Sequence, residues 1–158
     1  MTVIISERNL DIIRQQGIEN YPNECCGLLL GVINNSEKKA IKVIPVKNDW
    51  ENQKHLFTKK YDGLKRDLRD SFAINPLTLL KIQKEARNEN LNIVGIYHSH
   101  PDHSAIPSDF DRDIAYSVYS YLILSVQKNK VTDIFSWLLD DNGQFVREKL
   151  VVIYSYLE

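Results

Sequence analysis

The sequence predicts an α+β fold in which strands and helices are mixed along the chain. Short apolar runs rich in Val, Ile and Leu alternate with longer stretches whose apolar residues recur at helical spacing. Clusters of Asn, Asp, Ser and Gly separate these segments, as expected for turns. At 158 residues the chain is long enough for one proper core, so we expect a single domain over 1–158.

The first third of the chain is predicted to hold one helix among three strands. Apolar runs predict the strands at 3–5, 26–33 and 40–46, with a turn at Asn34-Asn35-Ser36 between the last two. Ser6 has the residue type of a helix N-cap, and the helix should run to about Asn20. This region therefore alternates strand, helix, strand and strand.

Residues 48–70 interrupt the pattern with many charges of both signs. They predict a solvated loop with some helix, and their place before the next helix makes them a candidate substrate-side flap. Beyond them Pro76 should begin a helix to about Asn90, and Ser108 should begin another. Strands are expected at 72–74, 93–98, 119–127, 133–139 and 145–154. Asp141-Asn142-Gly143 predicts a hairpin turn between the last two strands.

The most informative segment runs from His98 to Asp111. His98 and His100 are two residues apart at the end of a predicted strand, so both imidazoles point to the same face. Pro101 ends regular pairing there, and a helix beginning at Ser108 would carry Asp111 to the two histidines. Two histidines and a carboxylate are typical of a catalytic zinc site that keeps one position open for water.

Three candidate site residues also have simpler interpretations. Ser108 and Asp111 have the spacing of a helix capping box, which would need no metal. Glu24 stands at the mouth of an apolar strand, where a carboxylate is costly unless it is paired or lies in a cleft. It is a candidate for the proton-transfer group that a hydrolase needs, and a solvated loop Glu is the alternative.

These residues resemble the JAMM (MPN+) family of zinc metallopeptidases. The family pattern is an upstream Glu, then His-x-His-Pro, six residues, Ser, two residues and Asp, and this chain matches it at Glu24, His98, His100, Pro101, Ser108 and Asp111. The amino-acid sequence of residues 22–31 also resembles that of the small bacterial branch of the family, whose domain has about the length of this chain. The resemblance implies a curved mixed sheet flanked by helices, as in MPN domains.

The resemblance also implies a role for each residue. His98, His100 and Asp111 would bind one Zn²⁺ ion with a bound water. Glu24 would act as general base and then pass the proton to the leaving amine, while Ser108 would hydrogen-bond the oxyanion. The family has inactive members that lose these groups, and their presence here favours an active enzyme over a scaffold.

The family's substrates imply what this chain would cleave. Its members hydrolyse amide or isopeptide bonds, often after the C-terminal Gly-Gly of a ubiquitin-like protein. The small bacterial relatives suggest a ubiquitin-like or sulfur-carrier protein with an extended C-terminal tail, from which cysteine would be released. A general or cell-wall peptide hydrolase is one alternative. A zinc-stabilised, non-catalytic interaction module is the other, and Glu24 discriminates against it because a structural site would not need that carboxylate.

Composition agrees with a cytoplasmic enzyme. A net charge of −1 gives no indication of a basic surface that would bind nucleic acid or a membrane. The only cysteines, Cys25 and Cys26, are adjacent and poorly placed to form a disulfide, which favours a reducing compartment. Cys25 neighbours Glu24, but both thiols are expected to pack in the core rather than react.

Overall fold

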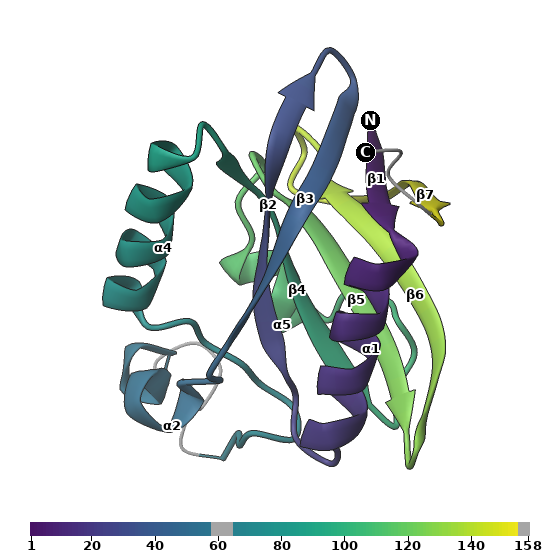
Figure 1. Ribbon diagram of the computed structural model, residues 1–158. Coiled ribbons are helices and arrows are strands. Elements are labelled where there is room, and N and C mark those ends of the chain that lie inside the picture. The colour runs from purple at the N-terminus through teal and green to yellow at the C-terminus, as the bar shows by residue number, and fades with distance from the viewer. Residues whose placement is uncertain (58–64, 155–158) are drawn as a thin grey trace.

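The computed structural model describes residues 1–57 and 65–154, in which seven strands build a single mixed sheet. The elements, in chain order, are β1 (Thr2–Ser6), α1 (Glu7–Asn20), β2 (Cys26–Asn34), β3 (Glu37–Val46), α2 (Trp50–Gln53), a 3-10 turn (Lys54–Phe57), α4 (Pro76–Asn88), β4 (Asn92–Pro101), α5 (Asp109–Ile114), β5 (Ser120–Gln127), β6 (Lys130–Leu139) and β7 (Phe145–Ile153). Figure 1 shows their arrangement.

The sheet has the strand order β1-β3-β2-β4-β5-β6-β7 and curves until it closes. It closes because β1 pairs in parallel with both β3 and β7. The pairing of β4 with β5 is also parallel, whereas β2–β3, β2–β4, β5–β6 and β6–β7 are antiparallel. The expectation of an α+β fold with a curved mixed sheet is therefore confirmed.

Two helices cover opposite faces of the central strands, and Figure 1 shows α1 and α4 on either side of β2 and β3. Side chains alternate along each strand, so neighbouring residues enter different cores. Leu29 and Tyr97 pack with Leu10 and Ile13 of α1 in one core. In the other core, Ile82 and Ala86 of α4 pack with three strand residues, Leu28, Leu30 and Ile96. The central strands are thus buried on both faces.

The helix starts follow the sequence signals. Ser6 caps α1, with its hydroxyl accepting from the Asn9 N–H at 3.1 Å. Asn75 caps α4 in the same way and Pro76 occupies the first helical turn. α4 ends at Asn88, slightly before the predicted boundary. The strand predictions at 3–5, 26–33, 93–98 and in the C-terminal third are also confirmed.

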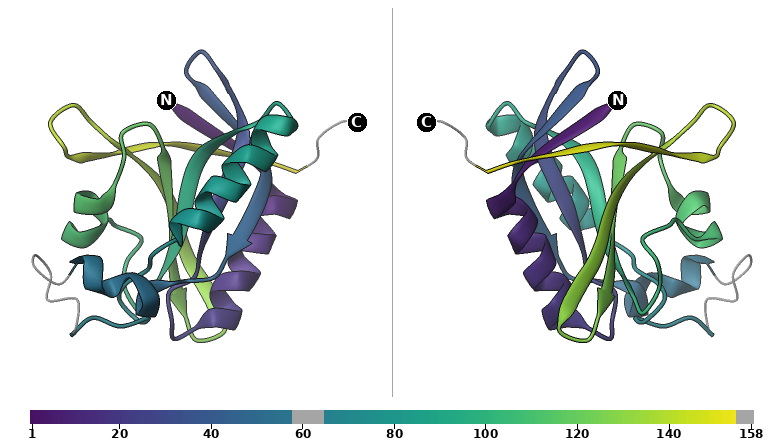
Figure 2. Two further views of the ribbon diagram at one scale, coloured as in Figure 1. Left: turned by 90° about the vertical axis from the view of Figure 1, so that its left-hand side faces the viewer. Right: turned by 90° about the vertical axis from the view of Figure 1, so that its right-hand side faces the viewer.

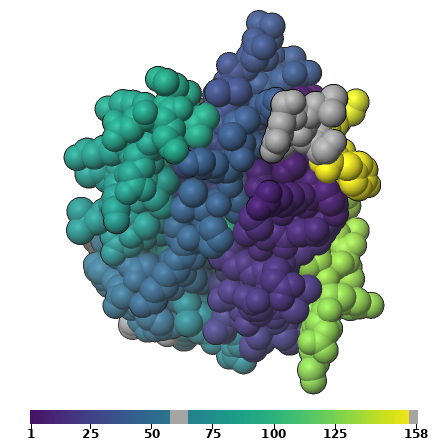
Figure 3. Space-filling view, in the orientation of Figure 1, coloured from purple at the N-terminus to yellow at the C-terminus, as the bar shows by residue number. Residues whose placement is uncertain are grey.

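The two hairpins differ in exposure. The tip of the β2–β3 hairpin, where Asn35 has a φ of 56°, projects beyond the other elements and forms the top of the space-filling view in Figure 3. The β6–β7 turn lies at the predicted Asp141-Asn142-Gly143 segment, and Gly143 has a φ of 74°. Glycine suits this position because side chains disfavour positive φ. Figure 2 shows this turn on the same side of the molecule as α5.

Two predictions between β3 and α4 need correction. Residues 72–74 form no strand, because their polar backbone groups bond to a loop instead: the Ala73 N–H donates to the Asn48 side chain and its carbonyl accepts from the Asp49 N–H. The interpretation of 48–70 as a solvated loop is wrong for Trp50, which is fully buried. Its ring lies 5.3 Å from Phe57 and 5.5 Å from Phe110, centroid to centroid. Residues 58–64, the rest of the candidate flap, lie outside the described residues.

Candidate metal centre

Strand β4 presents both histidines to the α4 side of the sheet. His98 and His100 follow Ile96 at intervals of two, so they share its face. His98 is fully buried and His100 is 7% exposed. β4 runs to Pro101, beyond the predicted strand end at His98, and Asp102 then turns the chain with a φ of 60° while its N–H donates to the Val126 carbonyl.

Helix α5 brings Asp111 to the histidines. Ser108 caps this helix, and the full capping box is present: the Ser108 hydroxyl accepts from the Asp111 N–H, and the Asp111 carboxylate accepts from the Ser108 N–H. The same carboxylate lies 3.1 Å from His98 Nε2 and 3.0 Å from His100 Nε2. The capping interpretation and the ligand interpretation of Asp111 are therefore compatible.

The three side chains form a group that could hold a metal ion. Their potential ligand atoms lie within 4.8 Å of one another, and the two Nε2 atoms are 3.0 Å apart. Ligand atoms about 2.0–2.1 Å from a tetrahedral zinc would be separated by roughly 3.3 Å, close to these distances. Because the group is buried, its electron pairs are not shared with bulk water.

The proton arrangement at His100 also fits a metal. His100 Nδ1 lies 2.8 Å from the Ser104 carbonyl, which can only accept, so Nδ1 carries a proton. When the ring is neutral, the lone pair of Nε2 therefore points toward His98 and Asp111. In that form Nε2 and the carboxylate are both acceptors, and a cation between them relieves their repulsion.

The charge state of the group points the same way. Burial lowers the pKa of His98, which favours the neutral ring that a metal requires. Although burial alone would raise it, the two imidazoles hold the pKa of Asp111 well below its usual value. Phe72 stacks on His98 with the ring centroids 4.4 Å apart and holds the imidazole plane. Asp111 raises the pKa of His100 against the effect of burial, so a metal that binds here displaces any proton held between His100 and Asp111.

Glu24 lies beside this group with a carboxylate that is not satisfied. Its side chain is 5% exposed, and Oε1 has no hydrogen-bond partner among the described residues. Burial raises the pKa of Glu24 well above its usual value, the Asp111 and Asp70 charges add to the rise, and Arg66 opposes it. The interpretation of Glu24 as a solvated loop residue is therefore wrong, because it is enclosed near Asp111 rather than exposed.

Asn48 holds the backbone around Glu24, a role that the sequence pattern did not indicate. Its Nδ2 donates to the carbonyls of Glu24 and Ser71 at 3.0 and 2.9 Å. Its Oδ1 accepts from the N–H groups of Trp50 and Ala73 at 3.1 and 3.2 Å. The Asn48 side chain thus uses its full hydrogen-bonding capacity. It links the backbone at Glu24, just before β2, to the loops beside it.

Ser108 is exposed and is hydrogen-bonded to Asp111 of the group. Its oxygen accepts from the Asp111 N–H at 3.0 Å, which leaves the hydroxyl proton available to another acceptor. The loop behind it is held by Trp137, whose Nε1 donates to the Ala105 carbonyl at 3.0 Å. Ser108 can therefore donate to a substrate oxygen without giving up its cap.

The two cysteines lie in the cores. Cys25 and Cys26 are buried free thiols, and each packs in a different one of the two cores. Burial raises the pKa of Cys25 to about 11 and raises that of Cys26 further. Thiolate is the nucleophilic form, so neither residue is prepared for catalysis. The prediction that both pack as core residues is confirmed.

We expect both thiols to resist modification in the folded protein. With a pKa of about 11, only about one Cys25 side chain in a thousand is thiolate at pH 8. A chromogenic disulfide reagent should therefore react with neither cysteine until denaturant is added, and then with both. Cys25→Ser and Cys26→Ser variants assign the two signals, and fast labelling of Cys25 in the native protein would contradict this description.

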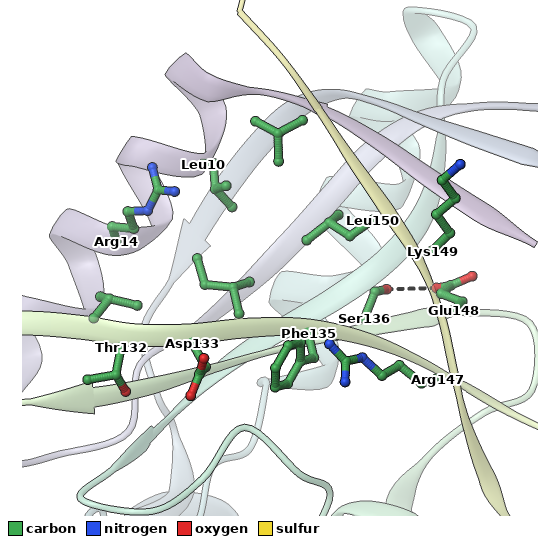
Figure 4. Close-up of a pocket in the computed structure, with 13 residues that line it drawn as sticks. Leu10, Arg14, Thr132, Asp133, Phe135, Ser136, Arg147, Glu148, Lys149 and Leu150 are labelled. Atoms are coloured by element: carbon green, nitrogen blue, oxygen red, sulfur yellow. Dashed lines mark hydrogen bonds between the residues drawn. The ribbon is translucent and has the colours of Figure 1, made fainter.

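A separate cavity of about 480 Å³ lies between α1 and the strands β6 and β7 (Figure 4). Leu10, Ile134 and Leu150 contribute to its apolar lining, and Ser136 donates to the Glu148 carboxylate at 2.7 Å on its wall. None of the residues that line it belongs to the metal group or neighbours Glu24. This cavity is therefore distinct from the candidate metal centre.

Comparison with known proteins identifies relatives over nearly the whole chain. A family model of prokaryotic homologues of the JAB domain matches residues 6–140. The desampylase of Pyrococcus furiosus is 26% identical over 151 residues, which cover 96% of this chain and 91% of the relative.

Solved structures agree in fold. Protein DSY2949 from Desulfitobacterium hafniense has a TM-score of 0.77 at 23% identity, with coverage of 98% of this chain and 95% of the other. A protein from Salinibacter ruber has a TM-score of 0.65 at 26% identity, with coverage of 94% and 90%. Among the described residues, no helix is long and apolar enough to cross a membrane.

Proposed function

The chain belongs to the family of prokaryotic JAB-domain proteins, and on that basis we propose that it is a zinc-dependent metallopeptidase or isopeptidase. The observation that carries the proposal is the enclosure of His98, His100 and Asp111 beside a buried carboxylate, Glu24, that lacks a partner for one oxygen. We propose His98, His100 and Asp111 as the zinc ligands. Zinc in such a site supplies Lewis-acid polarisation and an activated water.

Glu24 and Ser108 have the remaining catalytic roles, which are proton transfer and stabilisation of the oxyanion. Glu24 accepts a proton from the attacking water and delivers it to the leaving amine, and a raised pKa suits a group that must act as base and then as acid. Ser108 donates its free hydroxyl proton to the oxygen of the scissile carbonyl as negative charge develops there. Burial and the Asp111 and Asp70 charges raise the pKa of Glu24, and Arg66 acts in the opposite direction.

The substrate is a ubiquitin-like or sulfur-carrier protein with an extended C-terminal tail. The name of the P. furiosus relative, desampylase, supports a protein modifier as the substrate class. The connection from α5 to β5 is short. It therefore leaves little room for an inserted segment that would bind a further folded protein beside the carrier. Since Cys25 and Cys26 are free thiols, we place the reaction in the cytoplasm, a reducing compartment.

The alternatives account for less of the site. A non-catalytic module would have no use for the buried, partly unsatisfied Glu24, whose enclosure costs stability. A general or cell-wall peptide hydrolase would use the same site residues and differs only in what it cleaves. Substrate comparison therefore separates the two peptidase proposals.

The test is a cleavage panel with the zinc-loaded protein. Ubiquitin-like and sulfur-carrier proteins that end in Gly-Gly, each extended at the C-terminus, are compared with unrelated peptides and cell-wall fragments. Release of the extension from the tailed proteins alone supports the proposal. Equal cleavage of unrelated peptides would replace it with general peptidase activity.

Asn48→Asp tests whether the position of Glu24 matters. The change removes two N–H donors and sets a carboxylate against the carbonyls of Glu24 and Ser71. We expect turnover to fall about tenfold or more and the free energy of unfolding to fall by about 1–3 kcal/mol. Kinetics and denaturant unfolding measure both quantities.

Asn9→Asp is the matched control, because the Asn9 amide also donates to a carbonyl, that of Ile41, but far from the metal group. It should leave turnover close to that of the wild type. An equal loss of turnover in the two variants, at equal folded fraction, would remove the positioning role of Asn48.

A further inference from the structure

A small groove of about 180 Å³ opens directly beside Ser108. Arg112 of α5 and Gln144 of the β6–β7 turn line it together with Trp137, Phe145 and Ile106. Ligand pockets for drug-sized molecules usually occupy about 300–1,000 Å³, so this groove accommodates much less. A single amino acid is closer to its size than a folded protein or a long peptide.

The walls of the groove are held in place. Trp137 is fixed by its hydrogen bond to the Ala105 carbonyl, 3.0 Å long. The Gln144 N–H donates to the Asp140 carboxylate at 2.9 Å, and its carbonyl accepts from the Asp140 N–H at 2.8 Å. Phe145 packs edge-on against Tyr121 with the ring centroids 5.6 Å apart. The groove is therefore a formed feature of the β6–β7 turn and the loop before α5.

The polar groups that line the groove are mostly donors. The Ser108 hydroxyl has a proton to give, and none of the described residues hydrogen-bonds to the Gln144 side-chain amide. Among the described residues, the Arg112 guanidinium is paired only with Asp109, at 3.1 Å, and the Asp109 side chain is 87% exposed. Exposed pairs of this kind contribute little, so Arg112 can exchange this carboxylate for another. An anion with two acceptor oxygens matches this set.

The proposed function decides which carboxylate could reach this groove. Ser108 is the proposed donor to the scissile carbonyl, so the groove lies next to the bond that breaks. An internal peptide bond or an isopeptide bond to lysine has no free carboxylate beside it. A single residue attached to the C-terminus of a carrier protein does have one. The donors of the groove therefore fit a leaving amino acid, and its apolar walls fit the side chain of that residue.

We propose that this groove binds the free α-carboxylate of the leaving residue, with Arg112 as the main specificity-determining group. The inference rests on the proposed peptidase function and deepens it. The preferred substrate is a carrier protein extended by one amino acid with a free carboxyl terminus. A carrier joined to a lysine side chain of another protein would be a poorer substrate.

The test compares two substrates that differ only in this group: a tailed protein extended by one residue as the free acid, and the same protein as the C-terminal amide. We expect the zinc-loaded wild type to favour the acid by about tenfold or more in kcat/KM, through KM, since hydrogen bonds to charged groups are the stronger ones. Arg112→Gln should abolish the preference by slowing cleavage of the acid, and stoichiometric binding of zinc would show that the variant folds. Arg112→Lys should restore part of it.

Arg87→Gln, an exposed change on α4, is the control and should keep the preference. Equal cleavage of acid and amide by the wild type, or a preference that survives Arg112→Gln, would overturn this inference and leave the peptidase proposal standing. If the zinc-loaded wild type cleaves neither substrate nor any other tailed protein, the proposed function fails and this inference fails with it.

Discussion

Asp111→Asn is expected to lose the bound metal and, with it, at least about a hundredfold of the activity. The change keeps the shape of the side chain but removes the charge that faces both Nε2 atoms at 3.0 and 3.1 Å. Partners that only orient a metal ligand already contribute about 10- to 100-fold to metal affinity, so loss of a ligand should exceed that. Metal content after dialysis and the zinc dependence of turnover measure the effect.

Asp113→Asn is the matched control, because Asp113 is an exposed carboxylate on the same short helix. It should retain metal and activity. A second readout comes from thermal unfolding: zinc should raise the midpoint of the wild type and of Asp113→Asn, but not that of Asp111→Asn. Stoichiometric zinc in purified Asp111→Asn would show that the His98, His100 and Asp111 group is not the binding site.

Glu24→Gln is expected to retain zinc and fold while turnover falls by about a hundredfold to ten-thousandfold. That range is typical for removal of a general acid–base group, and glutamine keeps the size of the side chain but cannot carry the proton. The largest effect should fall on kcat, because Glu24 takes part in proton transfer. Single-turnover kinetics together with metal analysis separates this outcome from loss of the site.

The same variant should not destabilise the protein. Glu24 is enclosed, one of its oxygens lacks a partner, and the neighbouring Asp111 charge disfavours its ionised form. A neutral amide removes that repulsion, so the unfolding midpoint of metal-free Glu24→Gln should equal or exceed that of the wild type. Glu85→Gln, at an exposed residue of α4, serves as the control for both measurements. Full turnover in Glu24→Gln would contradict the assigned role.

Local features of the site could be predicted because each has a short-range cause. The interval of two residues along β4 places His98 and His100 on one face, whatever surrounds the strand. The Ser108 cap begins α5 and thereby sets Asp111 one turn inside it. Apolar runs located the strands, since burial on both faces leaves little room for polar residues.

Features that depend on distant contacts were not predicted. The closure of the sheet needs β1 to pair with β7, and no local pattern encodes which ends meet. Residues 72–74 have an apolar, strand-like composition, yet Phe72 packs on His98 and the backbone bonds to Asn48 and Asp49. Asn48 lies in a charged stretch, where nothing in the local sequence indicates that its side chain braces Glu24.

The most direct measurement is zinc reconstitution of metal-free protein, followed by release of the C-terminal extension from a tailed carrier protein. The wild type and Glu24→Gln are titrated side by side, with bound metal and product measured in each sample. We expect both to bind one zinc ion per chain, and only the wild type to recover activity in proportion to bound zinc. Activity in the chelated wild type, or equal activity in zinc-loaded Glu24→Gln, would contradict a metal-dependent hydrolase that uses Glu24.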